Sequence, residues 1–434
     1  MNVAPGTSTV KNSLSAHAAV GLLAGALLYI VALSGTLLVF YDELQRAEQP
    51  GIEMTAIEPA AIERAAASIM AREAGKPRTT HLYFNLPSPE FPRAIGYTDT
   101  QEVRIASDGR VADELETHWS EFLYAIHYAL TLPGAIGIIV VGILGVMMMT
   151  LSLSGVIAHP RIFRDAFRLR ARDGGGVGLT DWHNRLSVWT LPFIVMIALT
   201  GAVIGLGALT IEGVAARYYG GDTGEAYAPV FGGEHPVNLA PAGRLPAIAR
   251  SLDYMRAHYP GVEVTFLTIH DPLTKGQSIQ IMGEHPRRLI FGEYYNFDAD
   301  GNFENAAGLA DGELGQQAAA SNYNLHFGNY GGLTVKIAYF LLGLALTAIC
   351  ATGTFIWLGK RRRRGIVEPR LRAAWHGVVW GTPAALAVTF IARFAIGNGA
   401  PFVAIFWATL AAAVIGAVWS VTRSEPGPQP QPAE

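Results

Sequence analysis

The chain has 434 residues, of which half are hydrophobic and only 15% are charged, a composition too apolar for an ordinary soluble enzyme. The formal net charge of −3 argues against a nucleic-acid partner, because proteins that bind nucleic acids usually carry an excess of basic residues. The single cysteine, Cys350, excludes an intramolecular disulfide framework and a thiolate-ligated metal cluster.

Six apolar stretches are long enough to cross a bilayer as helices, which requires about 20 residues. The apolar run of the first is clearly longer than the roughly 7–15 residues of a signal-peptide core, so we expect it to be retained. The chain is therefore predicted to be a polytopic α-helical membrane protein. We place its six transmembrane helices at residues 18–41, 133–158, 186–210, 333–358, 374–396 and 401–422.

Basic residues in two short loops predict the orientation of these helices, since such loops stay in the cytoplasm. The loop 359–373 contains GKRRRRG, and the loop 159–185 contains five arginines. Both termini, including the tail 423–434 that we expect to be disordered, are then cytoplasmic. The connections 42–132 and 211–332 lie outside, and residues 41–121 fit this location with 15 acidic against 8 basic side chains. The five loop arginines are Arg161, Arg164, Arg168, Arg170 and Arg172.

The two outer connections share one order of elements. The first has a helical pattern, Pro59 to Gly75, followed by the alternating stretches THLYFNL, RAIGYT and EVRIAS. The second has a helical pattern, Gly243 to Gly261, followed by VEVTFLTI, SIQIMG and LIFGEYYNF. A helix followed by a small antiparallel meander, present twice, predicts two compact α+β modules.

Histidines and glycines recur at matched positions in the spans. The separation of His17 from Gly35 along the chain equals the separation of His183 from Gly201. In both cases a small polar residue stands directly before the glycine. Both histidines stand at the predicted cytoplasmic end of a span.

The span after each module repeats as well. His127 precedes Gly155 by almost the same interval at which His326 precedes Gly353, and the first interval is longer by a single position. This difference falls at a Pro-Gly or a Gly-Gly sequence, where helices are interrupted. The chain is therefore predicted to be internally duplicated, as span, outer module and span twice over, with two further spans at its end.

Paired histidines at membrane edges are candidate haem ligands, because imidazoles from facing helices commonly supply both axial ligands of a haem iron. His17 and His183 form a pair near the cytoplasmic side, and His127 and His326 form a pair near the outer side. Zinc is a rival, but no compact His-x₃-His spacing is present. A lone histidine at a membrane edge is more often an interfacial polar group, and matched positions in both repeats favour the ligand interpretation.

Other polar and aromatic residues receive less specific interpretations. His376 opens the fifth span without a repeat partner and is the reserve ligand, whereas His159 is interpreted as interfacial. Arg185 and Lys336 could neutralise haem propionates, although snorkelling to headgroups is commoner. The aromatic residues at the outer face could line an acceptor site, but an aromatic belt at the membrane surface explains them equally well. These aromatics are Trp119, Tyr124, Tyr128, Phe327 and Tyr330, and the histidines interpreted as surface or fold residues are His81, His118, His235, His258, His270 and His285.

The pattern resembles the PepSY-associated transmembrane family, which includes bacterial inner-membrane ferric-siderophore reductases and iron-regulated membrane proteins. The resemblance covers residues 10–365 and is carried by the His17 run ending in Ser34-Gly35, HYALTLPG, WHNRLSVW, LHFGNYGG and TGTFIWLGKRRR. It implies PepSY-like modules in the periplasm, haem b in the membrane and reduction of periplasmic iron chelates. The chain departs from the family in its two additional spans and in lacking an arginine beside His17.

The favoured function is a dihaem inner-membrane reductase, a haem-dependent oxidoreductase that reduces a ferric siderophore or another ferric chelate and releases Fe(II). The chain has no G-x-G-x-x-G fingerprint for a flavin or nicotinamide, so a quinol or a cytoplasmic flavoprotein is expected as electron donor. The alternative is a non-enzymatic PepSY-type membrane binding or regulatory protein. An iron-chelate permease is less favoured, because the spans show no pair of discontinuous helices.

The predicted topology can be tested with reporter fusions. Fusions at about residues 90 and 270 should report a periplasmic location, and fusions near residues 172 and 365 a cytoplasmic one, because arginine-rich loops resist translocation. Alkaline phosphatase and green fluorescent protein provide complementary readouts. A periplasmic signal from the GKRRRRG loop would overturn the topology, including the assignment of histidines to each face.

Overall fold

The computed structural model describes residues 7–51, 53–89, 91–159, 161–165, 177–232, 236–284, 289–290, 292–308 and 312–424. The chain divides into a helical unit, Met1–Tyr41, His118–Leu206 and Lys336–Glu434, and a sheet unit, Asp42–Thr117 and Gly207–Val335. Several residues named from the sequence lie outside the described ranges, namely Arg168, Arg170, Arg172, His235, His285 and all but the first two residues of the tail 423–434.

Within the described residues, six helices are long and apolar enough to cross a membrane, in agreement with the predicted number of spans. Two shorter helices, α6 (Ile162–Asp165) and α7 (Val177–Trp189), precede the third span, and α4 (His118–Ala129) precedes the second. The six long helices are α1 (Thr7–Leu38), α5 (Ala135–Ala158), α8 (Leu191–Tyr218), α12 (Gly332–Arg363), α13 (Pro369–Ala395) and α14 (Phe402–Ser424).

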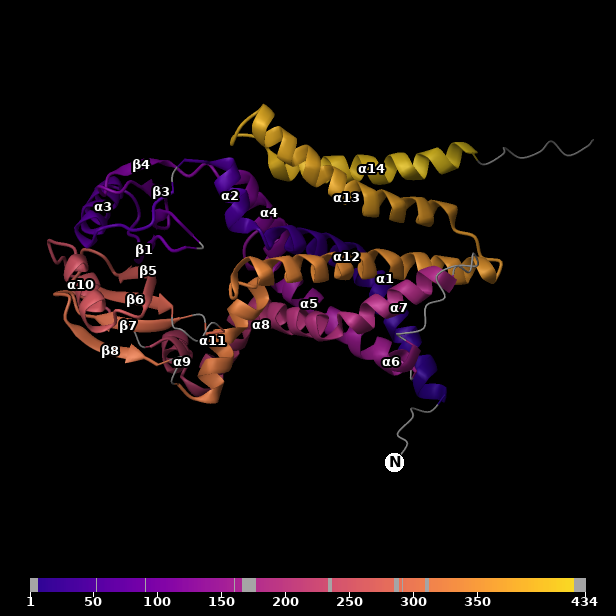
Figure 1. Cartoon of the computed structure of the whole chain (residues 1–434), viewed down its shortest axis with the longest axis horizontal. Helices are drawn as coiled ribbons and strands as arrows, with labels where there is room; N and C mark the ends of the chain where they lie inside the picture. The colour runs from indigo at the N-terminus through magenta and orange to yellow at the C-terminus, as the bar shows by residue number, and fades with distance from the viewer. Residues whose placement is uncertain are drawn as a thin grey trace, which may run out of the picture. The chain divides into compact units, whose positions relative to one another are not determined.

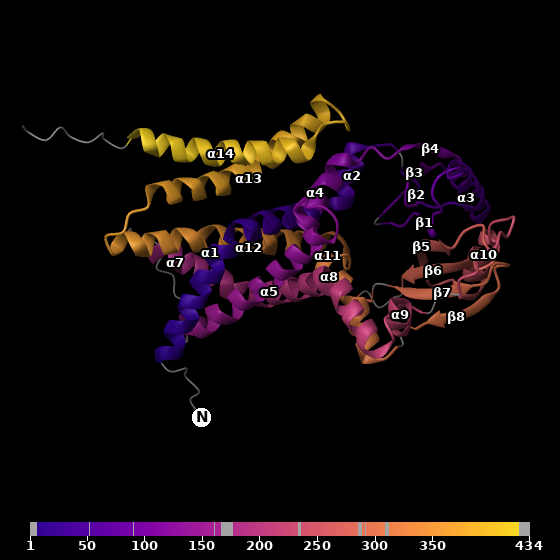
Figure 2. The same ribbon diagram turned by 180° about the vertical axis from the view of Figure 1, so that it is seen from behind.

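Small residues let the long helices approach closely, as is common where no water drives helices together. A Cβ atom added to Gly142 of α5 would lie 2.8 Å from the carbonyl carbon of Gly205 in α8. A Cβ atom added to Gly377 of α13 would lie 2.6 Å from Cα of Val414 in α14. Figures 1 and 2 show α13 and α14 running side by side.

A break separates α4 from α5 where the sequence has Pro133-Gly134. Gly134 has a positive φ of 59°, and the preceding Leu130 and Thr131 have φ values of 51° and 55°. The sequence predicts that the first outer module extends to residue 132, whereas in the structure α4 belongs to the helical unit. The reason is that α4 packs against α1, α13 and α14.

The sheet unit contains one eight-stranded antiparallel sheet in the order β4-β3-β2-β1-β5-β6-β7-β8. Each outer connection supplies four consecutive strands, and β1 pairs with β5 from His81↔His270 to Asn85↔Phe266. The sequence predicts two separate modules, but the structure joins them at this seam. The strands are β1 (His81–Asn85), β2 (Ala94–Tyr97), β3 (Glu102–Ile105), β4 (Val111–Glu114), β5 (Glu263–His270), β6 (Ser278–Glu284), β7 (Glu293–Phe297) and β8 (Phe303–Ala307).

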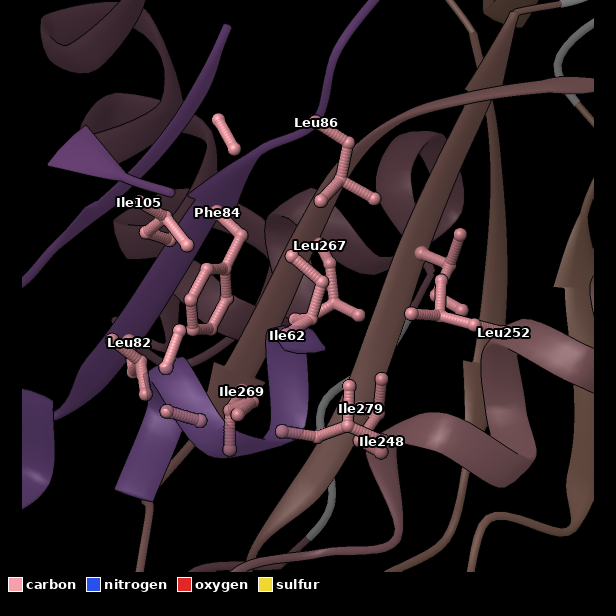
Figure 3. Close-up of a cluster of buried hydrophobic side chains, with 14 of the residues drawn as sticks. Ile62, Leu82, Phe84, Leu86, Ile105, Ile248, Leu252, Leu267, Ile269 and Ile279 are labelled. Carbon is pink, nitrogen blue, oxygen red and sulfur yellow. The ribbon is translucent and has the colours of Figure 1, made fainter. Parts of the chain in front are cut away.

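Two helices, α3 (Pro59–Arg72) and α10 (Ile248–His258), supply side chains to one hydrophobic core with these strands. Figure 3 shows Ile62 of α3 and Ile248 of α10 in the same cluster as Phe84 of β1 and Leu267 of β5. Each fully buried aliphatic or aromatic side chain stabilises the fold by roughly 1.5–3 kcal/mol. Because both halves contribute to one core, we expect them to unfold together. The remaining helices of the unit are α2 (Tyr41–Glu48), α9 (Thr223–Phe231) and α11 (Leu314–Phe327).

Two glycines with the same backbone conformation provide a test of this packing. Gly75 and Gly109 both have φ of 85°, but a Cβ atom on Gly109 would overlap the carbonyl oxygen of Ala61, whereas nothing lies within 4 Å of one on Gly75. Both alanine substitutions should cost about 1–2 kcal/mol of unfolding free energy for the left-handed backbone. Gly109→Ala should lose about 1–3 kcal/mol more through overpacking. Urea unfolding of the purified protein would measure this, and an equal loss in both variants would contradict the close packing of the turn on α3.

Candidate functional site

The ring of His17, on α1, rests against α5. Its Nδ1 atom lies 3.0 Å from the carbonyl oxygen of Leu151 and 3.2 Å from Oγ of Ser154. A Cβ atom added to Gly155 would lie 3.3 Å from Cε1 of His17. The glycine therefore leaves the space that the imidazole ring occupies.

The ring of His183, on α7, rests against α12 in the same manner. Its Nδ1 atom lies 2.9 Å from Oγ1 of Thr352, and the carbonyl of Ile349 also accepts a hydrogen bond from the ring. A Cβ atom on Gly353 would lie 3.7 Å from Cε1 of His183. The two rings thus meet the same three groups, a carbonyl, a hydroxyl three residues later and a glycine four residues later.

The ring of His127, on α4, rests against a third set of these groups, which lies on α1. Its Nδ1 atom donates to the carbonyl of Val31 at 2.9 Å. Ser34 follows three residues after this carbonyl, and a Cβ atom on the next residue, Gly35, would lie 2.5 Å from Cε1 of His127. We call such a set of carbonyl, hydroxyl and glycine a ring seat.

The spacing of a ring seat follows from helix geometry, since residues three and four apart share one face. The hydroxyl donates back to the seat carbonyl, a bond that serine and threonine commonly form in helices. Sequence reasoning noted some of these small polar–glycine pairs as span ends but missed their role. Among the described residues, a hydroxyl residue directly before a glycine makes this bond in Ser154 to Leu151 (3.2 Å), Thr352 to Ile349 (3.1 Å), Ser34 to Val31 (3.1 Å) and Thr200 to Ile197 (3.3 Å).

The hydrogen bonds orient the three rings and assign the tautomer of two of them. A carbonyl can only accept, so Nδ1 carries the proton in His17 and His127. The Nδ1 atom of His183 likewise faces its seat, at the hydroxyl of Thr352. In His17 and His127, Nε2 then carries the lone pair. Metal-ligating histidines have this arrangement, in which one ring nitrogen binds the metal and the other donates to a backbone carbonyl or another acceptor.

Electrostatics keep the His183 ring neutral. Burial, together with the nearby His17 and Lys360, lowers the pKa of His183 to about 4. The influence of His17 also shows that the two rings lie within electrostatic reach of each other. At neutral pH the imidazole of His183 is therefore uncharged, as a metal ligand must be.

The fourth matched histidine and the reserve ligand have different surroundings. His326 lies near the end of α11, in the sheet unit, half-buried and with its ring 5.8 Å from that of Phe327. His376 is exposed on α13 and packs 4.7 Å from the ring of Phe355. His159 ends α5 as its C-cap residue.

Histidines interpreted as fold residues take part in ring packing within the sheet unit. His81 and His270 face each other across the β1–β5 seam with ring centroids 5.0 Å apart. His258 stacks on Tyr254 at 3.9 Å. Over the described residues, no group of three or more His, Cys, Asp or Glu side chains could hold a metal ion.

Two cations named from the sequence are buried. Arg185 is 3% exposed and Lys336 is 7% exposed. A snorkelling side chain would extend its charge to water, so these exposures favour charges directed into the protein.

The part of the chain that contains these histidines resembles known proteins. The model of a family described as the PepSY-associated TM region matches residues 14–360. An uncharacterized protein of Pseudomonas aeruginosa is 28% identical over 265 residues, which cover 58% of this chain and 66% of the relative. The chain thus matches just under two thirds of that relative's length. The residues that fit the family model include the four candidate haem ligands and end before α13. These ligands are His17, His127, His183 and His326.

Two glycines of α1 test the ring seat by opposite effects on stability. Gly21→Ala should leave the melting temperature unchanged or raise it, because its Cβ atom would lie 3.7 Å from Leu151 and alanine favours a helix by up to about 1 kcal/mol. Gly35→Ala should lower it, because its Cβ atom would overlap the ring of His127 at a cost of about 1–3 kcal/mol. Thermal unfolding in detergent would measure both. A Gly35→Ala variant as stable as Gly21→Ala would refute the seat.

Proposed function

The chain belongs to the PepSY-associated transmembrane family, and we propose that it is a dihaem reductase of the bacterial inner membrane. In this proposal it passes electrons across the membrane to ferric siderophores or related ferric chelates in the periplasm. The observation that carries the proposal is the repeated ring seat. Three imidazoles are each held through Nδ1, the orientation that leaves Nε2 as the metal ligand.

Two haem b groups fit the ligand set. His17 and His183 would hold the inner haem, since the two rings lie within electrostatic reach of each other. His127 would hold the outer haem, and the sequence repeat supplies His326 as its second ligand.

Two separate centres follow from the length of α1. The stretch of helix from His17 to Gly35, which seats His127, is about 27 Å long at a rise of about 1.5 Å per residue. One iron cannot bind ligands so far apart. The ligands at the two ends of α1 would therefore hold two separate haem groups.

The chemistry of the bound group and the work of the protein can be separated. When bound, haem b supplies reversible one-electron transfer. The chain's residues orient the ligands through the ring seats and keep the His183 imidazole neutral. The buried Arg185 and Lys336 would pair with propionates.

Reduction suits the proposed substrate. Siderophores hold Fe(III) through hard oxygen donors, and Fe(II) is bound much less tightly. Transfer of one electron to Fe(III) therefore releases Fe(II) without any bond of the chelator being cleaved. The electron would come from a quinol or a cytoplasmic flavoprotein.

Alanine variants of the four histidines test the proposal. His17→Ala and His183→Ala should each remove or alter the inner haem alone, and His127→Ala and His326→Ala the outer haem alone, because each loses one axial ligand. Reduced-minus-oxidised spectra and haem-to-protein ratios would measure this. Outer-haem variants should lose reduction of a periplasmic ferric chelate while the inner haem is still reduced by the donor.

His81→Ala, His258→Ala and His270→Ala are the controls, and each should retain wild-type haem content. Unchanged spectra in all four ligand variants, or a colourless wild-type protein, would refute the dihaem reductase. A colourless protein would favour the non-enzymatic PepSY-type binding or regulatory protein.

A further inference from the structure

The helix that carries His127 is packed against two helices that lie outside the family match. The match ends at residue 360, whereas α13 begins at Pro369 and α14 at Phe402. α4 has only 12 residues, a length at which an isolated helix is marginal in water. Its position must therefore be set by the helices around it.

One side of α4 faces α1. His127 donates to Val31 of α1, and Tyr41, three residues beyond the end of α1, donates its hydroxyl to Glu121 and packs 6.1 Å from the ring of Tyr124. Residues 121, 124 and 127 follow one another at intervals of three, so they lie along one flank of the helix. This flank places the ring of His127 in its seat.

The other side of α4 faces the hairpin of α13 and α14. Trp119 donates its indole N–H to Oγ1 of Thr389 at 3.0 Å, and both side chains are buried. Phe122 packs against both Phe402 and Phe406, with ring centroids 5.9 Å apart in each case. A buried indole N–H requires a hydrogen-bond acceptor. The bond from Trp119 to Thr389 therefore fixes the position of α4 along α13.

The hairpin also holds the turn that follows α4. Trp407 of α14 donates its indole N–H to Oγ1 of Thr131 at 2.9 Å. Leu130 and Thr131 both have positive φ, a conformation that a β-branched residue such as threonine rarely adopts. Strained backbone of this kind persists where surrounding contacts hold it. The turn begins three residues after His127.

We propose that the hairpin α13–α14 is a clamp that positions α4, and that Trp119, Thr389 and Trp407 are positioning residues for the outer haem ligand His127. The inference rests on the proposed function, since it concerns the outer haem. It gives the two spans beyond the family match a role in the same site. Loosening the clamp would let the His127 ring shift in its seat and would weaken the outer haem, whereas the inner haem would be unaffected.

The test uses the full-length protein with haem bound. Thr389→Val removes the acceptor of Trp119 with little change in shape, and Thr389→Ser restores the hydroxyl. Trp407→Phe removes the second indole donor, and Trp380→Phe is the matched control, because Trp380 lies on α13 and is 71% exposed. The outer-haem signal is identified as the one lost in His127→Ala. Haem transfer to apomyoglobin and electron paramagnetic resonance then follow each haem separately.

Thr389→Val and Trp407→Phe should each speed transfer of the outer haem roughly fivefold, as expected for the loss of one buried hydrogen bond, and should shift its g values. Thr389→Ser and Trp380→Phe should match the wild type, and the inner haem should be unchanged throughout. An unchanged outer haem, or an equal change in both haems, would overturn the clamp alone. A colourless wild-type protein would refute the proposed function and the clamp together.

Discussion

The helical unit depends on the hydrogen bond between an imidazole N–H and a backbone carbonyl of a neighbouring helix. A helix carbonyl is already occupied by its own ladder, so a second donor can reach it only where the adjacent side chains are small. Glycine four residues after the carbonyl opens that space, and the hydroxyl three residues after it bonds the same carbonyl. Each of these three seats therefore depends on the position of one histidine and one glycine.

The sheet unit follows a different constraint, the pairing of strand edges. β1 and β5 would each be an exposed edge if the two connections folded apart, and such edges invite association with other chains. Their pairing removes both edges and lets α3 and α10 share one core. The outer ends of the sheet are then the short strands β4 and β8.

The sequence shows features that are encoded locally. The positions of the spans follow from the lengths of the apolar stretches. The distance between His17 and Gly35 along α1 follows from their separation in sequence, because each residue of a helix adds a fixed rise. The break before α5 follows from Pro133-Gly134. What could not be predicted is which helix lies against which, because that depends on packing between residues far apart in the chain. The seat of His127 on α1 and the seam between β1 and β5 are both of this kind.

The helix α1 links the two candidate centres through its own rigidity. It carries His17, whose ring enters α5, and it also carries Gly35, which receives the ring of His127. Neighbouring turns of a helix are tied together by its backbone hydrogen bonds, so a shift of α1 along its axis that improved one contact would disturb the other. The two contacts therefore fix the register of α1 jointly. A substitution at Gly35 cannot be relieved by sliding α1, because the ring of His17 would then leave the carbonyl of Leu151.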